Sequence, residues 1–216
     1  MKKFTAIIFD LDGVIIDTEP LHARTKRMAF DQYGVTAPDD FYAEFIGRSD
    51  EDMVKGVVEQ FGPSTLEWRD VLARKHELFN EFESEIELIP GATEFIAAAR
   101  NHFGKLALVT SATRRNQQYA MGRFGLESSF DVIVTAEDIL RTKPDPEPYL
   151  TAVSRLGVPA ETCLVIEDST HGVVSANAAG CAVVAITTSF TAEQLGNVDP
   201  QYIVSSYTEL TSLLDI

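Results

Sequence analysis

The sequence predicts an α/β protein: a three-layer domain with a parallel sheet, into which an all-helical segment is inserted after the first strand. Two observations support this fold class. Short apolar, β-branched runs alternate with helical patterns, and most of these runs are too continuous to leave one face in water. Such alternation is typical of βαβ units, in which helices cover both faces of parallel strands. Residues 18–87 depart from the alternation and show only helical pattern.

The predicted elements follow one another regularly outside that segment. The strands cover residues 4–9, 106–109, 132–134, 164–166 and 182–186, with a weaker strand at 202–204. The helices cover residues 92–103, 114–124, 147–156 and 172–179, and a further helix lies near 209–214. Most of these strands are separated from the next by a helix, as a doubly covered parallel sheet requires.

The segment after the first strand is much longer than a crossover needs. A βαβ connection takes about a dozen residues, whereas this segment has roughly 70. Pro38 and the Gly62-Pro63 pair divide it into helices. An apolar stripe at helical spacing marks one of them: Trp68, Leu72, Phe79, Phe82 and Ile86. We therefore expect a core domain of residues 1–17 and 88–216, and a helical cap domain of residues 18–87.

Charge and composition exclude several classes of protein. The 33 acidic and 18 basic residues give a net charge of −15, which argues against binding to nucleic acid or anionic membrane. Cys163 and Cys181 are too few for a disulfide framework and lack metal-ligand spacing. No apolar stretch approaches the ~20 residues that span a bilayer, and Asp10 and Asp12 interrupt the run that a signal peptide needs. We expect a cytoplasmic monomer.

Polar side chains follow four of the predicted strands at their carboxyl ends, where parallel sheets bind ligands. They are Asp10 and Asp12 after the first, Ser111 after the second, Lys143 past a loop after the third, and Glu167 and Asp168 after the fourth. Asp10, Glu167 and Asp168 supply the hard oxygen ligands that Mg²⁺ prefers together with water and phosphate. Without a cation such a cluster would repel itself, so the sequence predicts a magnesium site.

The same residues suit phosphoryl transfer. Ser111 and Lys143 would hold the oxygens of a phosphate that approaches the metal. A carboxylate aimed at phosphorus acts as a nucleophile, which is the role we expect for Asp10. Asp12 would protonate the leaving oxygen and later deprotonate water. Gly13 would let the chain turn sharply at this point.

Four segments resemble the motifs of the haloacid dehalogenase superfamily, most closely its sugar-phosphate phosphatase and β-phosphoglucomutase-like branch. They are Phe9-Asp10-Leu11-Asp12-Gly13-Val14, Ser111, Lys143-Pro144-Asp145-Pro146 and Glu167-Asp168-Ser169. The resemblance covers essentially the whole chain and implies a Rossmann-like core with a small helical cap. In having a second aspartate, Asp12, the chain resembles the phosphatases and mutases of the superfamily rather than the dehalogenases that give it its name, which lack this residue.

The resemblance also implies a role for each matched residue. Asp10 would form an aspartyl-phosphate, and Asp12 would act as general acid and base while its backbone carbonyl binds Mg²⁺. Glu167 and Asp168 would complete the metal site. The substrate-binding set would comprise Ser111, its neighbour Ala112 and Lys143 in the core, with His22, Arg48 and Lys75 in the cap.

Simpler alternatives exist for most of these residues. Ser111 would also serve as the N-cap of the helix that follows it, and Glu167-Asp168-Ser169 as acidic capping of the next one. Lys143 and Lys75 would be solvated lysines, and His22 an exposed helical histidine.

The function expected from the sequence is a magnesium-dependent phosphatase for a small phosphorylated metabolite. One alternative is a phosphomutase, an isomerase, and another is a non-catalytic sugar-phosphate sensor. In the cap loop Gly47-Arg48-Ser49-Asp50, the mutase pattern has an arginine where this chain has Asp50, which argues against the mutase.

Overall fold

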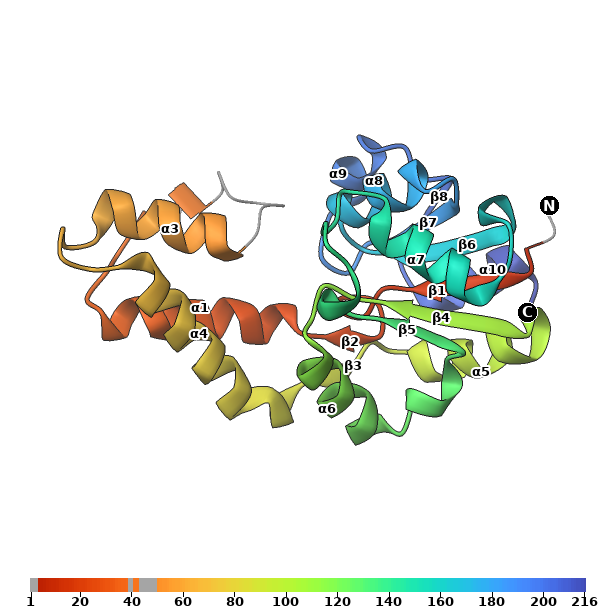
Figure 1. Ribbon diagram of the computed structural model, residues 1–216, viewed down its shortest axis with the longest axis horizontal. Coiled ribbons are helices and arrows are strands. Elements are labelled where there is room, and N and C mark those ends of the chain that lie inside the picture. Colours follow the sequence, from red (N-terminus) through yellow and green to blue (C-terminus); the bar gives the residue numbers. More distant parts are fainter. Residues whose placement is uncertain (1–3, 39–40, 43–49) are drawn as a thin grey trace. The chain divides into compact units, whose positions relative to one another are not determined.

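A computed structural model describes residues 4–38, 41–42 and 50–216 (Figure 1). The chain divides into two compact units. Met1–Asp17 and Glu87–Ile216 form the first, which we call the core unit, and Thr18–Ile86 form the second, which we call the helical unit.

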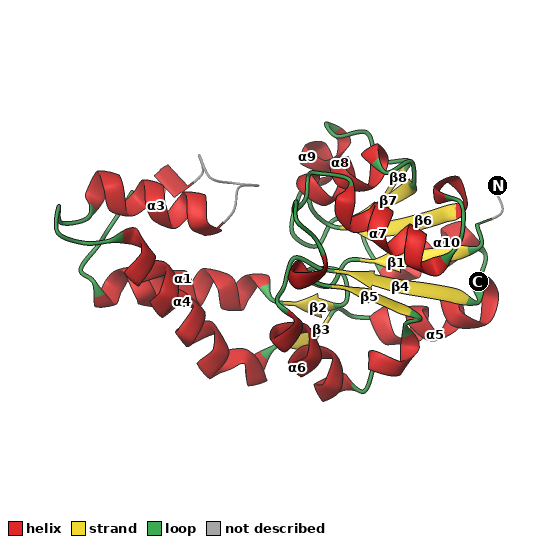
Figure 2. Cartoon of the chain, viewed as in Figure 1, coloured by secondary structure: helices red, strands yellow, loops and turns green. Residues whose placement is uncertain are grey.

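The core unit is built on one parallel sheet (Figure 2). Among the described residues it has six strands in the order β5-β4-β1-β6-β7-β8. Their bounds are β1 Ala6–Phe9, β4 Lys105–Val109, β5 Val132–Val134, β6 Cys163–Glu167, β7 Ala182–Ile186 and β8 Tyr202–Val204. The register pairs Phe9 with Leu108 on one side and with Ile166 on the other, so the carboxyl ends of the central strands lie level. The predicted parallel sheet is confirmed.

Helices cover both faces of this sheet because residues along β1 alternate between two apolar layers. Ala6 and Ile8 belong to a buried cluster with residues of α7 and α8. Phe9 points the other way and packs edge-on against Phe95 of α5, whose ring lies 5.1 Å from that of Tyr207 in α10. The helices of the unit are α5 Ala92–Phe103, α6 Arg114–Phe124, α7 Glu147–Leu156, α8 Thr170–Ala178, α9 Ala192–Gly196 and α10 Tyr207–Leu214. The three-layer α/β prediction is therefore confirmed.

One feature of the core unit is absent from the sequence-based prediction. Ile16–Asp17 (β2) and Glu87–Leu88 (β3) pair as a two-stranded antiparallel sheet where the chain leaves the core unit and returns to it. The prediction of helical pattern alone across residues 18–87 is wrong at Glu87. Two residues a strand are too few to produce an alternating pattern that sequence inspection could detect.

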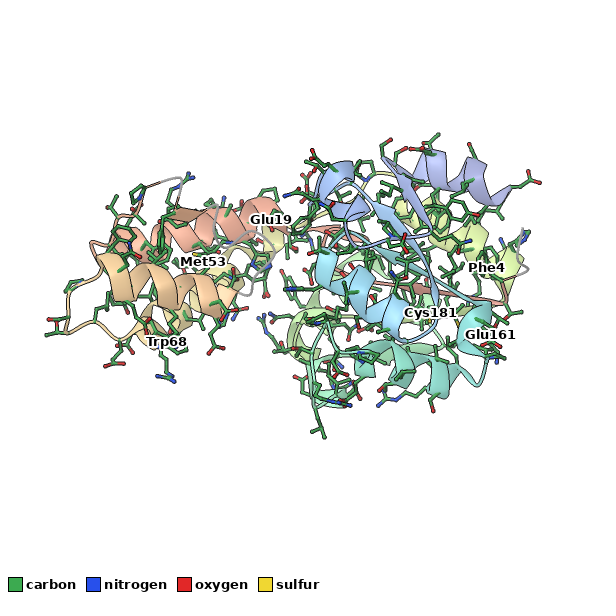
Figure 3. All side chains as sticks on the ribbon, turned by 90° about the horizontal axis from the view of Figure 1, so that it is seen from above. Phe4, Glu19, Met53, Trp68, Glu161 and Cys181 are labelled. Atoms are coloured by element: carbon green, nitrogen blue, oxygen red, sulfur yellow. The ribbon has the colours of Figure 1, made fainter. Side chains whose placement is uncertain are left out.

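The helical unit is made, in its described part, of α1 Glu19–Gln32, α3 Asp50–Phe61, α4 Trp68–Phe82 and the short 3₁₀ helix η1 Glu83–Glu85. Met53 of α3 is buried in the apolar core of this unit, and Trp68 packs against that core from the start of α4 (Figure 3). The predicted stripe on α4 is wrong at Ile86, because η1 ends the regular helix before that residue. In neither unit does a described helix combine the length and the apolar character needed to cross a membrane.

Candidate active site

Four of the predicted site residues meet in the core unit around the ammonium group of Lys143. Its Nζ lies 2.5 Å from Asp10 Oδ1 and 2.7 Å from Glu167 Oε1. Asp10 follows β1, Glu167 ends β6, and Asp168 comes directly after it. Asp10, Glu167 and Asp168 are buried and offer three ligand oxygens within 4.8 Å of one another. The simpler alternative of a solvated loop lysine does not describe Lys143, because only 8% of its side chain is exposed.

Glu167 is held more tightly than any other member of this cluster. Its Oε1 accepts hydrogen bonds from Lys143 Nζ and from the hydroxyl of Tyr149, at 2.7 and 2.8 Å. Its Oε2 accepts from the backbone N–H groups of Asp168 and Ser169, at 2.9 and 3.0 Å, and from Ser169 Oγ at 3.0 Å. Five hydrogen bonds fix this carboxylate, so it acts as a rigid negative charge beside Lys143.

Burial and charge shift the pKa values in this cluster in opposite directions. Burial raises the pKa of Asp10 to about 8, and Lys143 offsets this only in part. Burial, together with the charges of Glu167 and Asp10, also raises the pKa of Asp168 well above its usual range. Burial by itself would also raise the pKa of Glu167, but Lys143 and the hydrogen bonds outweigh burial and lower this pKa overall. The positive charge of Lys143 therefore outweighs burial, with the hydrogen bonds, at Glu167 but offsets burial only in part at Asp10 and Asp168.

The turn after β1 brings Asp12 and Gly13 to the same edge of the sheet. Leu11 O accepts hydrogen bonds from the backbone N–H groups of Ile15 and Ile16, and Gly13 N–H donates to Ile16 O at 2.7 Å. Gly13 has φ +72°, and a Cβ atom there would overlap the Asp168 carboxylate. Glycine is required here both for its backbone conformation and for this close approach. The half-buried Asp12 sits within the turn, two residues from Asp10.

Ser111 and Ala112 follow β4, whose neighbour in the sheet is β1. Ser111 is exposed, and it is not the N-cap of α6. That role belongs to Thr113, whose side chain accepts a hydrogen bond from the backbone N–H of Asn116. The capping alternative for Ser111 is therefore wrong, and its hydroxyl is not used to begin the helix.

A similar result holds after β6. Ser169 is the N-cap of α8, and its Oγ accepts from the backbone N–H of Gly172 at 3.0 Å. Capping at this position thus comes from Ser169, while Glu167 faces Lys143. Gly172 lies so close to Glu167 that a Cβ atom there would overlap the carboxylate, which explains a glycine in the first turn of this helix.

Comparison with known proteins assigns the chain to a family. A sequence model of the haloacid dehalogenase-like hydrolases matches residues 7–186. The chain belongs to this family. The matched region begins in β1 and ends with β7, so it includes all four strand ends that carry the site.

Several relatives of this haloacid dehalogenase-like hydrolase have been named for their activity or solved in complex. A Thermotoga maritima protein named phosphorylated carbohydrates phosphatase is 36% identical over 183 residues, which cover 81% of each chain. Pyrophosphatase PpaX of Bacillus velezensis is 28% identical over 221 residues, covering 100% of this chain and 98% of that protein. The structure of a mutant CbbY from Rhodobacter sphaeroides in complex with xylulose-(1,5)bisphosphate has a TM-score of 0.80 and 27% identity, and covers 96% of each chain.

The predicted cap residues of the hydrolase belong to the helical unit. Lys75 Nζ lies 2.8 Å from His22 Nδ1 and 2.5 Å from Asp50 Oδ2, and Lys26 Nζ lies 3.2 Å from Asp50 Oδ1. Lys75 is 2% exposed, so the alternative of a solvated lysine is wrong for it. His22 stacks on Phe79 at 4.4 Å, and burial with the charge of Lys75 lowers the pKa of His22 to about 3. His22 is thus a neutral partner of Lys75 at physiological pH.

Arg48, the third predicted cap residue, lies outside the described residues. Asp50, at the position that argues against the mutase, is described. It forms ion pairs with two lysines of the helical unit, Lys75 and Lys26.

Sequence inspection missed several residues that shape the site of the hydrolase. Tyr149, fully buried in α7, donates its hydroxyl hydrogen to Glu167. Thr188 and Ser189 follow β7, and the Thr188 hydroxyl donates to Gly13 O at 2.5 Å. The strand-end rule would have found this last pair had it been applied to the strand at 182–186 as well. No comparable sequence signal marks Tyr149.

Proposed function

We propose that this hydrolase is a magnesium-dependent phosphatase that removes phosphate from a small phosphorylated metabolite through an aspartyl-phosphate on Asp10. The observation that carries this proposal is the cluster of Asp10, Lys143, Glu167 and Asp168 at the carboxyl ends of β1 and β6. The relatives named as phosphatases of phosphorylated carbohydrates and of pyrophosphate support the reaction class. A sugar phosphate or a similar phosphomonoester is the substrate class we favour.

The residues present fit a divalent cation. Asp10, Glu167 and Asp168 offer buried carboxylate oxygens, the donor set that Mg²⁺ prefers. Burial raises the pKa values of Asp10 and Asp168 and Lys143 offsets this only in part, so a further positive charge would favour their ionised forms. We propose that Asp10, Asp168 and the backbone carbonyl of Asp12 hold the cation, with Glu167 completing the site. When bound, the cation supplies positive charge that keeps these carboxylates ionised and attracts the substrate phosphate.

The proposed reaction has two steps, each carried out by residues of the core unit. A carboxylate oxygen of Asp10 forms a bond to phosphorus while the ester oxygen leaves and takes a proton from Asp12. Asp12, now a carboxylate, then accepts a proton from water. The water oxygen bonds to phosphorus, the bond to Asp10 breaks, and inorganic phosphate is released. Lys143 and Ser111 would hold the phosphoryl oxygens in both steps, with Ala112 beside them.

His22, Lys75 and Arg48 remain proposed substrate contacts of the cap. We propose that Asp50 favours the phosphatase over the mutase, because it places a negative charge where the mutase pattern has an arginine. The ion pairs of Asp50 with Lys75 and Lys26 support a role for this aspartate in arranging the cap lysines.

A panel of phosphorylated compounds tests the proposal. Sugar phosphates, phosphoglycolate, nucleotides and pyrophosphate are incubated with the protein and Mg²⁺, and inorganic phosphate is measured. We expect release from a sugar phosphate or a similar monoester, and none when EDTA replaces Mg²⁺. A phosphoryl group that moves on the sugar without release, followed by ³¹P NMR, would instead support the mutase. Binding without either change would support the sensor.

The shifted pKa of Asp10 predicts how stability depends on pH and metal. Its unfolded pKa lies near 3.8 and its folded pKa near 8, so its contribution to stability is complete below pH 4 and is lost as the pH rises toward 8. We expect the Tm of the metal-free protein to fall between pH 5.5 and 8.5, by on the order of 10 °C. Saturating Mg²⁺ replaces the bound proton, so it should raise the Tm most at pH 8.5.

Differential scanning fluorimetry in EDTA and in Mg²⁺ measures these shifts. Asp10→Asn cannot titrate at this position, so it should show a smaller pH dependence of Tm in EDTA. An Mg²⁺-induced shift that is equal at all pH values, or largest at pH 5.5, would contradict the linkage between proton and metal.

A further inference from the structure

The loop after β7 lies beside two loops of the proposed site. β7 pairs with β6 in parallel, and the register sets Ala185 opposite Glu167. β6 in turn pairs with β1, whose end carries Asp10. The three strands are neighbours in the sheet, so the residues that follow Ile186 emerge next to Asp168 and next to the turn of Asp12 and Gly13.

Two hydroxyl groups of this loop bind those neighbours. Thr188 Oγ1 donates to the backbone carbonyl of Gly13 at 2.5 Å. The hydroxyl of Ser189 lies beside the Asp168 carboxylate, since Ser189 Oγ and Asp168 Oδ2 both border the same side of Gly13, and it acts to lower the pKa of Asp168. A Cβ atom on Gly13 would overlap Asp168 Oδ2 and would lie 2.7 Å from Ser189 Oγ. Gly13, Asp168 and Ser189 therefore come together at one point.

The contacts of Thr188 and Ser189 restrict two groups of the proposed site, the Asp168 carboxylate and the turn that carries Asp12. Asp168 is 4% exposed and has the negative charges of Glu167 and Asp10 for neighbours. A hydrogen bond from a neutral hydroxyl restricts rotation of this carboxylate without neutralising it, which leaves its charge available to a cation. The bond from Thr188 fixes the Gly13–Val14 peptide, and so restrains the turn on which Asp12 is carried.

We propose that Thr188 and Ser189 are positioning residues of the phosphatase site: Ser189 orients Asp168 toward the cation, and Thr188 holds the turn that carries Asp12. This inference rests on the proposed function, since it needs a cation at Asp168 and chemistry at Asp12. Both residues are exposed overall, so their removal leaves the apolar core unchanged. Loss of a hydrogen bond to a metal ligand typically costs 10–100-fold in metal affinity or activity.

The test compares variants that remove each hydroxyl with variants that keep it. Mg²⁺ alone is titrated into the protein by isothermal titration calorimetry, without substrate. We expect Ser189→Ala to raise the Kd for Mg²⁺ by roughly 10–100-fold, and Ser189→Thr to restore it. Thr188→Val should lower kcat about tenfold at saturating Mg²⁺ with little change in KM, and Thr188→Ser should recover it.

Matched controls come from α10 of the same unit. Thr211 Oγ1 donates to Tyr207 O, and Ser212 Oγ donates to Thr208 O, at 2.8 and 3.0 Å. Thr211→Val and Ser212→Ala therefore remove similar hydrogen bonds within α10, and they should leave the Kd for Mg²⁺ and kcat unchanged. A wild-type Kd in Ser189→Ala together with wild-type kcat in Thr188→Val would overturn the inference while the proposed function stands. Absence of both Mg²⁺ binding and phosphate release in the wild-type protein would overturn both.

Discussion

Replacing Asp10 by asparagine is expected to lower kcat for phosphate release by roughly 10⁴-fold or more, because a neutral amide cannot attack phosphorus as a carboxylate does. The substitution preserves the shape of the side chain and its acceptor oxygen toward Lys143. It also removes a buried carboxyl whose ionisation is opposed by its surroundings, since burial raises its pKa to about 8. The free energy of unfolding should therefore be unchanged or higher at neutral pH, so the loss of activity would not reflect misfolding.

Two measurements check this prediction. Steady-state phosphate release gives kcat, and mass spectrometry of acid-quenched protein should detect a phosphoryl group on the peptide containing Asp10 in the wild-type protein but not in Asp10→Asn. Asp215→Asn is the matched control, because Asp215 is an exposed aspartate at the C-cap of α10 in the same unit. It should keep the wild-type kcat. An Asp10→Asn variant with full activity would exclude Asp10 as the nucleophile.

The sheet could be predicted from sequence because its strands are buried on both faces. The run at 182–186 is continuously apolar, and the observed β7, Ala182–Ile186, has the predicted bounds. The helices α5, α6 and α7 likewise begin and end at the predicted residues, where glycines 104, 125 and 157 mark their C-terminal ends. β2 and β3 could not be predicted because each has only two residues and depends on a partner far along the chain: Ile16 pairs with Leu88, and Asp17 pairs with Glu87.

The site could be predicted only where charge and position coincide. Asp10, Lys143 and Glu167 carry charges that are costly to bury, so their place at strand ends already indicated chemistry. Tyr149, Thr188 and Ser189 carry no charge, and hydroxyl groups are common in loops and helices. The strand-end rule can locate Thr188 and Ser189 as candidates, but only distances show what a hydroxyl binds: 2.8 Å from Tyr149 to Glu167 and 2.5 Å from Thr188 to Gly13. A sequence pattern does not encode which hydroxyl reaches which carbonyl across three strands.

Replacing Lys143 by methionine should have the second largest effect, and it should act on both stability and activity. Methionine retains an unbranched side chain that ends one atom short of the lysine ammonium, so it removes the charge that lies between Asp10 and Glu167. Glu167 is fully buried, and its lowered pKa depends chiefly on Lys143 to overcome burial. Breaking such a buried ion pair typically costs about 3–5 kcal/mol, so the Tm of the metal-free protein should fall clearly. Loss of a cation that holds phosphoryl oxygens should lower kcat by about 10²–10³-fold.

Magnesium separates this electrostatic role from simple packing. If Lys143 supplies charge to the carboxylates, Mg²⁺ should raise the Tm of Lys143→Met by more than it raises that of the wild-type protein, because the cation partly replaces the missing ammonium. Lys105→Met is the control: Lys105 is exposed, and its Nζ donates to Leu156 O at 2.7 Å in the same unit. It should keep both kcat and the wild-type response to Mg²⁺. An equal Mg²⁺-induced shift in Lys143→Met and wild type would mean that the carboxylate cluster does not depend on this lysine for its charge balance.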